Sequence, residues 1–430
     1  MKLLLISDMA HTGFGRVGRE LATGLLQLGW ELRIIGVNWR GEAMEWAARV
    51  QGSLNPRDTM VSAAKELAED PLVEWMIPAG SPGDGMGNQL LAPAARGRVW
   101  PGWIPDRILI VADPRAMFFR LLADQKVTEQ IPTANYVPIE GTELPPSMRN
   151  LWQHAHPVAM SKFGQAQLEA LLSRPVPMIY HGVSPAFRPL SVREPGEYKG
   201  VPITDREMAK AAFGLGGKTV ILRTDRYIER KNYAAFFRIL RPVLAKHPEI
   251  MVIVHTVTGD PDGKGDIREL ISREPGAVNA GSYMEWEHPQ IRLTGAHDSW
   301  RGLSDQDLRL LYCAADLYVS PTMAEGFGLC LVESMACGTP VIATDFSSIT
   351  EVVGAGGMLI PPDHYLTNPY GNEWALVDEA AMTAAIERFL SHRRLRRELV
   401  EAALTQVAQF NWPQAVIAFD RLLEGLGGAS

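Results

Sequence analysis

Short apolar runs alternate with helix-length amphipathic segments through most of this 430-residue chain. That alternation is typical of βαβ units, in which parallel strands form a sheet covered by helices on both faces. In the first half the predicted strands are Lys2–Ile6, Glu31–Val37, Arg107–Ala112, Ala134–Pro138, Pro157–Met160 and Met178–Tyr180. In the second half they are Lys218–Arg223, Ile250–His255, Ile291–Thr294, Leu317–Ser320, Pro340–Ala343 and Met358–Ile360. The pattern predicts an α/β fold with two doubly wound, Rossmann-like domains.

A polar, proline-punctuated stretch, Phe187–Asp205, separates the two series of strands. The chain is too long for one ordinary hydrophobic core and suits two domains of about 200 residues each. We expect a first domain at residues 1–188, a linker at 189–204, a second domain at 205–410 and a terminal segment at 411–430. Ligands of open parallel sheets bind beyond the carboxyl ends of the strands, so a cleft between the domains is predicted.

Composition narrows the class of protein. Hydrophobic residues make up 46% and charged residues 21%, which indicates a globular chain. No stretch approaches the roughly 18 apolar residues of a membrane span. Asp8 and His11 cut the first apolar run short of a signal peptide, so a cytoplasmic location is expected. Residues 1–190 carry 18 basic and 18 acidic side chains, so the net charge of -7 lies in the rest of the chain, and neither half is strongly basic. The three cysteines lack metal-ligand spacing and are expected to be buried.

The glycines of Gly13-x-Gly15-x-x-Gly18 resemble a dinucleotide fingerprint, but their context argues against one. That fingerprint needs its first glycine directly after the strand, whereas six residues separate Ile6 from Gly13. The strand Glu31–Val37 also lacks a following acidic residue to hold ribose hydroxyls. The helix is predicted at Arg16–Leu28, and the glycines need another explanation.

The most informative stretch of the second half is "SPTMAEGFGLCLVESMACGTPVIATD", Ser320–Asp345. A strand ends at Ser320, and Glu325-Gly326-Phe327-Gly328 leads into an amphipathic helix that carries Glu333. Glycines at such a junction leave backbone N–H groups bare, and a helix N-terminus attracts phosphate. In this arrangement Glu325 would accept from a sugar hydroxyl and Glu333 from a ribose.

Two cations precede the next predicted helix in "RTDRYIERKNYAAF". Arg226 and Lys231 follow a strand and reach the same crevice, where they would neutralise a leaving diphosphate without a metal ion. The alternative is an exposed, solvated helix start.

Taken together, these motifs resemble the retaining GT-B-fold glycosyltransferases of family 4, the glycosyl transferases group 1. The resemblance covers nearly the whole chain and is most specific over Ile291–Pro362, "IRLTGAHDSWRGLSDQDLRLLYCAADLYVSPTMAEGFGLCLVESMACGTPVIATDFSSITEVVGAGGMLIPP". It implies donor contacts from a glycine loop and from both glutamates of a Glu-x7-Glu motif. The implied donor-binding residues are Gly295, Glu325, Gly326, Phe327, Gly328, Leu329, Glu333, Arg226 and Lys231. "NWPQAVIAFDRLLEGL" resembles the family's terminal helix, which crosses back onto the first domain.

The resemblance also gives the glycines near the N-terminus a role. Gly13, Phe14 and Gly15 would line the cleft from the first domain, where glycine allows close approach. It further implies a UDP- or GDP-linked sugar as donor, no cofactor or metal, a front-face reaction that retains the anomeric configuration, and a monomer or homodimer. The proposed catalytic residues are Glu325, Asp113, Arg226 and Lys231.

Acceptor residues are harder to predict. Asp113 stands where many family members have a histidine, and it would orient or deprotonate the acceptor hydroxyl or cap a helix. Glu140 also follows a strand and would face the acceptor. "RGRVWPGWIPDR" places Arg96, Arg98, Trp100 and Trp103 together, which suits an anionic acceptor, including a hydroxylated base in DNA, or a surface loop with packed tryptophans. A small sugar or a lipid-linked acceptor is the family's commonest expectation.

Several alternatives stay open at this point. A sugar-nucleotide epimerase or hydrolase of the same fold, an NAD-dependent oxidoreductase and a non-catalytic binder share parts of the pattern. Asp260-x-Asp262 resembles a metal motif, yet a polar turn explains it better. His255 and His297 are expected to line or pack near the nucleotide pocket.

Overall fold

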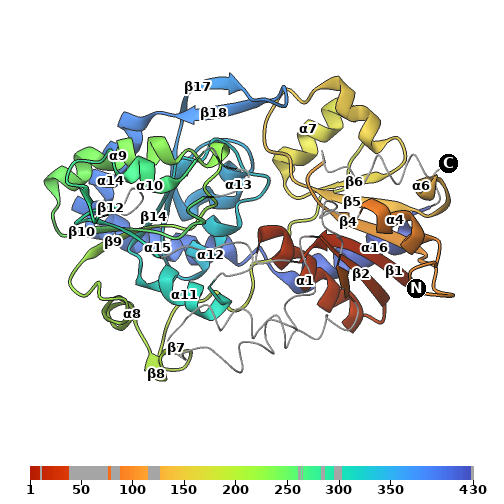
Figure 1. Ribbon diagram of the computed structural model, residues 1–430, viewed down its shortest axis with the longest axis horizontal. Helices are drawn as coiled ribbons and strands as arrows, with labels where there is room; N and C mark the ends of the chain where they lie inside the picture. The colour runs from red at the N-terminus through yellow and green to blue at the C-terminus, as the bar shows by residue number, and fades with distance from the viewer. Residues whose placement is uncertain are drawn as a thin grey trace.

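The computed structural model describes residues 1–9, 12–37, 76–78, 88–114, 126–259, 263, 265–281, 286–294 and 303–427. Within these ranges two six-stranded parallel sheets form two domains that face each other (Figure 1). The strand orders are β3-β2-β1-β4-β5-β6 and β13-β10-β9-β14-β15-β16. Each sheet has the doubly wound order that the alternation of apolar runs and helices predicts.

The first sheet is built on the apolar runs of the first half. Its strands are β1 (Lys2–Asp8), β2 (Glu31–Val37), β3 (Met76–Pro78), β4 (Arg107–Val111), β5 (Thr133–Val137) and β6 (His156–Ala159). Its helices are α1 (Gly13–Gln27), α4 (Asn88–Ala95), α6 (Val127–Gln130), α7 (Lys162–Leu172) and the 3-10 helix η2 (Pro146–Trp152). Val17, Leu21 and Leu25 form the buried stripe of α1, because residues three to four apart share one helix face.

The second sheet is likewise built on the apolar runs of the second half. Its strands are β9 (Thr219–Arg223), β10 (Ile250–Val254), β13 (Ile291–Leu293), β14 (Leu317–Ser320), β15 (Val341–Thr344) and β16 (Gly357–Ile360). Its helices are α8 (Arg206–Ala212), α9 (Tyr233–Lys246), α10 (Ile267–Ile271), α11 (Asp305–Ala314), α12 (Leu329–Ala336), α13 (Ser348–Val353), α14 (Glu379–Ser391) and α15 (Arg393–Val407), with short 3-10 turns η3 (Glu229–Lys231) and η4 (Gly354–Gly356). A small hairpin, β11 (Val278–Asn279) with β12 (Trp286–Glu287), lies outside the main sheet.

The terminal helix α16 (Trp412–Gly425) returns to the first domain and completes its core (Figure 1). The ring of Phe419 packs edge-on against Tyr136 at 4.8 Å between ring centroids. Asp420 accepts a hydrogen bond of 2.7 Å from the indole Nε1 of Trp30. The return of this helix, implied by the family resemblance, is confirmed.

The linker carries more structure than its composition indicates. It contains a hairpin of β7 (Gly196–Tyr198) and β8 (Val201–Ile203). The guanidinium of Arg309, fully buried on α11, donates to the carbonyl of Arg188 and to three linker carbonyls, those of Pro189, Glu194 and Pro195, at 2.7 to 3.2 Å. A planar cation with five donors suits this task, and it fixes the linker to the second domain.

Two predicted elements need correction. Helix α1 begins at Gly13 rather than Arg16, because Thr12 caps it by accepting a 3.0 Å hydrogen bond from the backbone N–H of Gly15. Met178–Tyr180 is not a strand, since only Met178 makes an isolated bridge to Ala159. A third hairpin, β17 (Pro362–Thr367) with β18 (Glu373–Val377), was not predicted at all.

His181 joins the two domains and the terminal helix. Its ring lies 3.7 Å from that of Phe327 and stacks on Trp412 at 5.6 Å between centroids. The ring is 1% exposed, and its burial lowers the pKa of His181 to about 4. Burial penalises the charged imidazolium, so the histidine is neutral in the folded chain near neutral pH.

Acidification is therefore expected to weaken the fold through His181. The unfolded histidine takes up a proton below about 6.5 and the folded one only near 4, so stability falls by about 3 kcal/mol as the pH drops through this interval. Denaturant titrations between pH 7 and pH 4 measure the effect. His181→Phe, which keeps an aromatic ring, should flatten the pH dependence, whereas His364→Ala on the surface should leave it unchanged. Equal slopes for wild type and His181→Phe would contradict the assignment.

Candidate functional site

A buried glycine loop between β14 and α12 forms the centre of the site. Gly328 has φ of 99° at the N-cap of α12, a conformation that favours glycine. Ser348 donates its hydroxyl to the carbonyls of Glu325 and Phe327 at 2.8 and 3.1 Å. Ser347 accepts a 2.9 Å hydrogen bond from the backbone N–H of Glu325. The loop is held from α13, so that its shape is fixed before a ligand binds.

Glu325 and Lys231 form a buried ion pair at this loop. Lys231 Nζ lies 2.5 Å from Glu325 Oε1 and 2.7 Å from Asp225 Oδ1. Burial alone would raise the pKa of Glu325, but Lys231 and Arg230 hold it below its ordinary value. Burial likewise opposes ionisation of Asp225, and Lys231 and Arg223 nevertheless lower its pKa to about 2. Both carboxylates are therefore ionised, and the cation between them is fixed.

Arg230 joins the two domains at the same place. Its guanidinium lies 3.0 Å from Glu325 of the second domain and 2.8 Å from Glu140 of the first. It also donates to the carbonyl of Ala324. Gly326 packs so closely on the first domain that a Cβ built there would lie 2.1 Å from Pro138 Cβ. The predicted acceptor-side residue Glu140 is thus brought next to the predicted donor residue Glu325.

Arg226, predicted to pair with Lys231, lies exposed on the same segment, while Lys231 is buried. The structure therefore separates the roles of the two cations: Lys231 is fixed by carboxylates and Arg226 faces outward. The second cation that contacts Glu325 beside Lys231 is Arg230, which sequence reasoning missed. Its position beside Lys231 in "IERKN" was the available signal.

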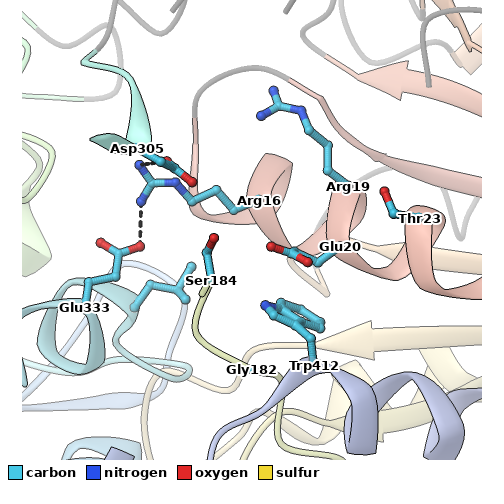
Figure 2. Close-up of a pocket in the computed structure, with 10 residues that line it drawn as sticks. Arg16, Arg19, Glu20, Thr23, Gly182, Ser184, Asp305, Glu333 and Trp412 are labelled. Carbon is cyan, nitrogen blue, oxygen red and sulfur yellow. Dashed lines mark hydrogen bonds and ion pairs between the residues drawn. The ribbon is translucent and has the colours of Figure 1, made fainter. Parts of the chain in front are cut away.

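Glu333 lies in the middle of α12, where Arg16 of the first domain reaches it. Arg16 of α1 lies 2.5 Å from Glu333 Oε1 and 3.1 Å from Asp305, and the hydroxyl of Tyr312 donates to Glu333 at 2.9 Å. Burial raises the pKa of Glu333, although Arg16 acts against that shift. Figure 2 shows Arg16 pointing between Glu333 and Asp305, with Glu20 and Trp412 further along the same pocket. The pocket has a volume of about 200 Å³.

The glycines of α1 now have distinct explanations. A Cβ on Gly18 would lie 2.4 Å from Ser7 Oγ, so Gly18 lets α1 pack directly on β1. A Cβ on Gly13 would lie 3.2 Å from Leu329 Cδ1 in the second domain. Phe14 and Gly15 lie in the same first turn of α1. Gly13 therefore lies close to Leu329 of α12 in the second domain, and the role of Gly13, Phe14 and Gly15 in lining the donor cleft stays a prediction.

Glu351 is a further residue between the domains. It accepts hydrogen bonds from the backbone N–H groups of Lys162 and Phe163 at 3.1 and 2.8 Å. The hydroxyl of Tyr180 also donates to it. These two N–H groups begin α7 in the first domain, so a carboxylate of the second domain caps a helix of the first.

The proposed acceptor residues divide into two groups. Asp113 and Glu140 follow β4 and β5, so both lie at the carboxyl edge of the first sheet. Arg96, Arg98, Trp100 and Trp103 precede β4, and Asp106 exchanges hydrogen bonds with Lys2 at the start of β1.

This second group therefore lies at the amino edge of the sheet, away from the cleft. Trp103 is 5% exposed and packs in the core, with Trp100 edge-on at 5.7 Å between centroids. The prediction that this cluster contacts the acceptor is wrong, because parallel strands place it at the opposite edge. The reason for expecting a DNA acceptor is removed with it.

Some predicted residues lie outside the described part of the chain. They are Gly295, His297, Asp260 and Asp262. His255 is described, and its Nδ1 lies 2.7 Å from Thr294 Oγ1 near the carboxyl end of β10. In the described ranges, no group of three or more His, Cys, Asp or Glu is placed to hold a metal ion. None of the described helices is both long and apolar enough to cross a membrane.

The sequence and the fold of this chain are similar to those of known glycosyltransferases. Residues 218–392 match the family model of the glycosyl transferases group 1. O-antigen chain mannosyltransferase B of Escherichia coli is 34% identical over 137 residues, which are 30% of this chain and 32% of that protein. Sucrose-phosphate synthase of Thermosynechococcus elongatus superposes over 100% of both chains with a TM-score of 0.65 and 17% identity. The Anabaena protein HepE, solved with UDP and glucose, covers 99% of this chain and 100% of its own, with a TM-score of 0.63 and 17% identity.

Residues 218–392 of the second domain are thus similar to the glycosyl transferases group 1, and the whole chain has the GT-B fold of two facing Rossmann-like domains. The chain matches its curated relatives over less than half of their own length. At 17% identity, the likeness to the two solved structures concerns the fold.

Proposed function

We propose that this chain is a retaining glycosyltransferase, which moves a sugar from a nucleoside-diphosphate sugar to an acceptor hydroxyl without a metal ion. The observation that carries the proposal is the buried Lys231–Glu325 pair at the N-terminus of α12, pressed against the first domain at Gly326 and Pro138. The family match of the second domain supports the class of reaction. UDP and glucose in a protein of the same fold support a nucleotide-sugar donor, here UDP- or GDP-linked.

The chemistry follows from the charges around the loop. The bond between the sugar's anomeric carbon and the diphosphate oxygen breaks, and negative charge grows on the leaving diphosphate. Lys231, Arg226 and the positive end of the α12 helix dipole would stabilise that charge in place of a metal ion. Ionised Glu325 would accept hydrogen bonds from the sugar hydroxyls, and Glu333 from the ribose hydroxyls, beside Arg16.

Retention requires attack on the face from which the diphosphate leaves. The acceptor oxygen then bonds to the anomeric carbon, and its proton passes to the departing phosphate oxygen. Asp113 and Glu140, at the carboxyl edge of the first sheet, are the proposed acceptor-side residues. The cytoplasm is the proposed location, and a monomer or a homodimer the proposed assembly.

Turnover is expected to persist in a chelator. Fixed cations would neutralise the diphosphate, so a millimolar excess of EDTA should leave the initial rate of nucleotide release unchanged within a factor of two. The control is the same assay with added manganese or magnesium. Complete loss of activity in EDTA, restored by either metal, would show that the metal-free mechanism is wrong.

The product is expected to keep the donor's anomeric configuration. UDP-glucose and GDP-mannose are supplied separately with a set of methyl glycosides, and proton NMR of the product reads the new anomeric coupling. An inverted product would rule out the front-face reaction. Consumption of donor to an isomeric or free sugar without acceptor would identify an epimerase or hydrolase, and a nicotinamide absorbance change would identify an oxidoreductase.

A further inference from the structure

The hairpin of β17 and β18 extends from the second domain across to the first (Figure 1). Glu373 on β18 forms an antiparallel bridge with Thr142 of the first domain, through backbone hydrogen bonds of 2.9 and 3.3 Å. The hairpin is also joined to the glycine loop between β14 and α12, because the N–H of Ala375 donates to the carbonyl of Met323 at 3.0 Å. The hairpin therefore lies over the junction where the glycine loop meets the first domain.

A small pocket lies beneath the turn of this hairpin. Its walls come from the hairpin and from the loops after β4 and β5, including Pro114, Pro138, Glu140, Asn368, Tyr370 and Trp374. Its volume is about 20 Å³. A cavity of that size admits about one water-sized group.

Two hydrogen-bond donors on residues that line this pocket have no partner among the described residues. They are Asn368 Nδ2 and Trp374 Nε1, on side chains that are 4% and 6% exposed. The other end of the Asn368 amide is fixed, since its Oδ1 accepts from the N–H of Tyr370 at 2.8 Å. Buried donors are nearly always paired in folded proteins, so these two indicate a ligand group or a water.

The same pocket also contains an acceptor of hydrogen bonds. The carboxylate of Glu140 lines it and is tied through Arg230 to Glu325. A hydroxyl group has two acceptor lone pairs and one donor hydrogen. It would therefore match two unpaired donors and one carboxylate, and its small size matches the volume of the pocket.

We propose that this pocket is an acceptor subsite, which binds one hydroxyl group of a saccharide while the exposed ring of Tyr370 supports the sugar. Tyr370 is 55% exposed at the turn of the hairpin. The proposal rests on the proposed glycosyltransferase function. It adds that the acceptor is a saccharide and that one of its hydroxyl groups binds in this pocket. Because Glu140 reaches Glu325 through a single arginine, a sugar held here lies beside the predicted position of the donor sugar.

The first test is binding of methyl α-D-mannopyranoside and methyl α-D-glucopyranoside to the full chain in the presence of UDP, measured by saturation-transfer NMR. We expect Asn368→Asp and Trp374→Phe, each of which removes one donor, to weaken glycoside binding at least tenfold. His364→Ala on the same hairpin, outside the pocket, should bind as wild type does. Equal binding by all four proteins, or no binding of either glycoside by the wild type, would overturn the proposal.

A second measurement does not depend on the variants folding well. Wild-type chain is tested with the mono-deoxy forms of whichever methyl glycoside binds. We expect removal of one particular hydroxyl to abolish binding, and equal loss at every position would contradict a single-hydroxyl pocket. Variants that change the melting temperature but not the glycoside affinity would show that the donors bind only a buried water.

Failure of this subsite and failure of the proposed function give different results. UDP affinity and nucleotide-sugar turnover are measured on the same proteins. If the variants turn over the nucleotide sugar and bind the glycoside as tightly as the wild type, the proposed subsite is wrong and the proposed transferase function stands. If the wild type binds a glycoside in the pocket but turns over no UDP- or GDP-sugar, the proposed transferase function is wrong and the subsite stands.

Discussion

Replacing Lys231 with alanine is expected to lower kcat about 100- to 1000-fold, a loss of about 3 to 4 kcal/mol of transition-state stabilisation. The ammonium group is held between Asp225 and Glu325, where it would face charge that grows as the diphosphate leaves. Steady-state kinetics with UDP-glucose or GDP-mannose, whichever is turned over, measures the effect. Unchanged kcat with a raised KM would mean that Lys231 binds the ground state and transition state equally.

This substitution also affects the fold, so stability must be measured beside activity. Lys231→Ala leaves two buried carboxylates without their shared cation, and breaking a buried pair costs about 3 to 5 kcal/mol. Lys231→Met, of similar volume, separates the loss of charge from the loss of packing. Lys246→Ala is the matched control, because Lys246 is 64% exposed and pairs with Glu387 on the surface.

Replacing Gly326 with alanine is expected to push the two domains apart. A Cβ at this position would lie 2.1 Å from Pro138 Cβ and 2.9 Å from Pro138 Cα, contacts that no side-chain rotation relieves. We expect transfer to fall at least tenfold while UDP affinity is kept, with an overpacking cost of about 1 to 3 kcal/mol. Kinetics, UDP titration and small-angle X-ray scattering of domain separation together test this.

The chain offers both a control and a rescue for Gly326→Ala. Gly216→Ala adds a methyl group where nothing lies within 4 Å, and it should behave as wild type. Pro138→Gly removes the opposing carbon, so the double variant should regain activity relative to Gly326→Ala alone. Additive losses in the double variant would show that the contact between Gly326 and Pro138 does not govern activity.

Parallel strands were the part of the fold most readily predicted from sequence. Glu31–Val37 and Leu317–Ser320 have the predicted bounds, because strands buried on both faces appear as continuous apolar runs. The hairpin of β17 and β18 was missed because its first strand is largely exposed and polar, as "PDHYLT" indicates. Its turn, "NPYGN", was the one available signal.

Sequence patterns predicted some residues of the site and missed others, because only some of them belong to short motifs along the chain. Glu325, Lys231 and Glu333 belong to motifs that are local in sequence, and the structure brings Glu325 and Lys231 into contact. Arg230–Glu140 and Arg16–Glu333 join residues far apart in the chain, which no local pattern reveals. The error with Trp103 was avoidable, because a segment that precedes β4 must lie at the amino edge of a parallel sheet.

Helix α16 has a consequence for how the protein is made. Phe419 and Leu423, at 0% exposure, complete the hydrophobic core of the first domain from the last part of the described chain. During synthesis, therefore, the domain that emerges first from the ribosome is completed last. Until residues 412–425 emerge, Tyr136 lacks its contact with Phe419, and exposed apolar surface of this kind favours aggregation of a partly folded chain.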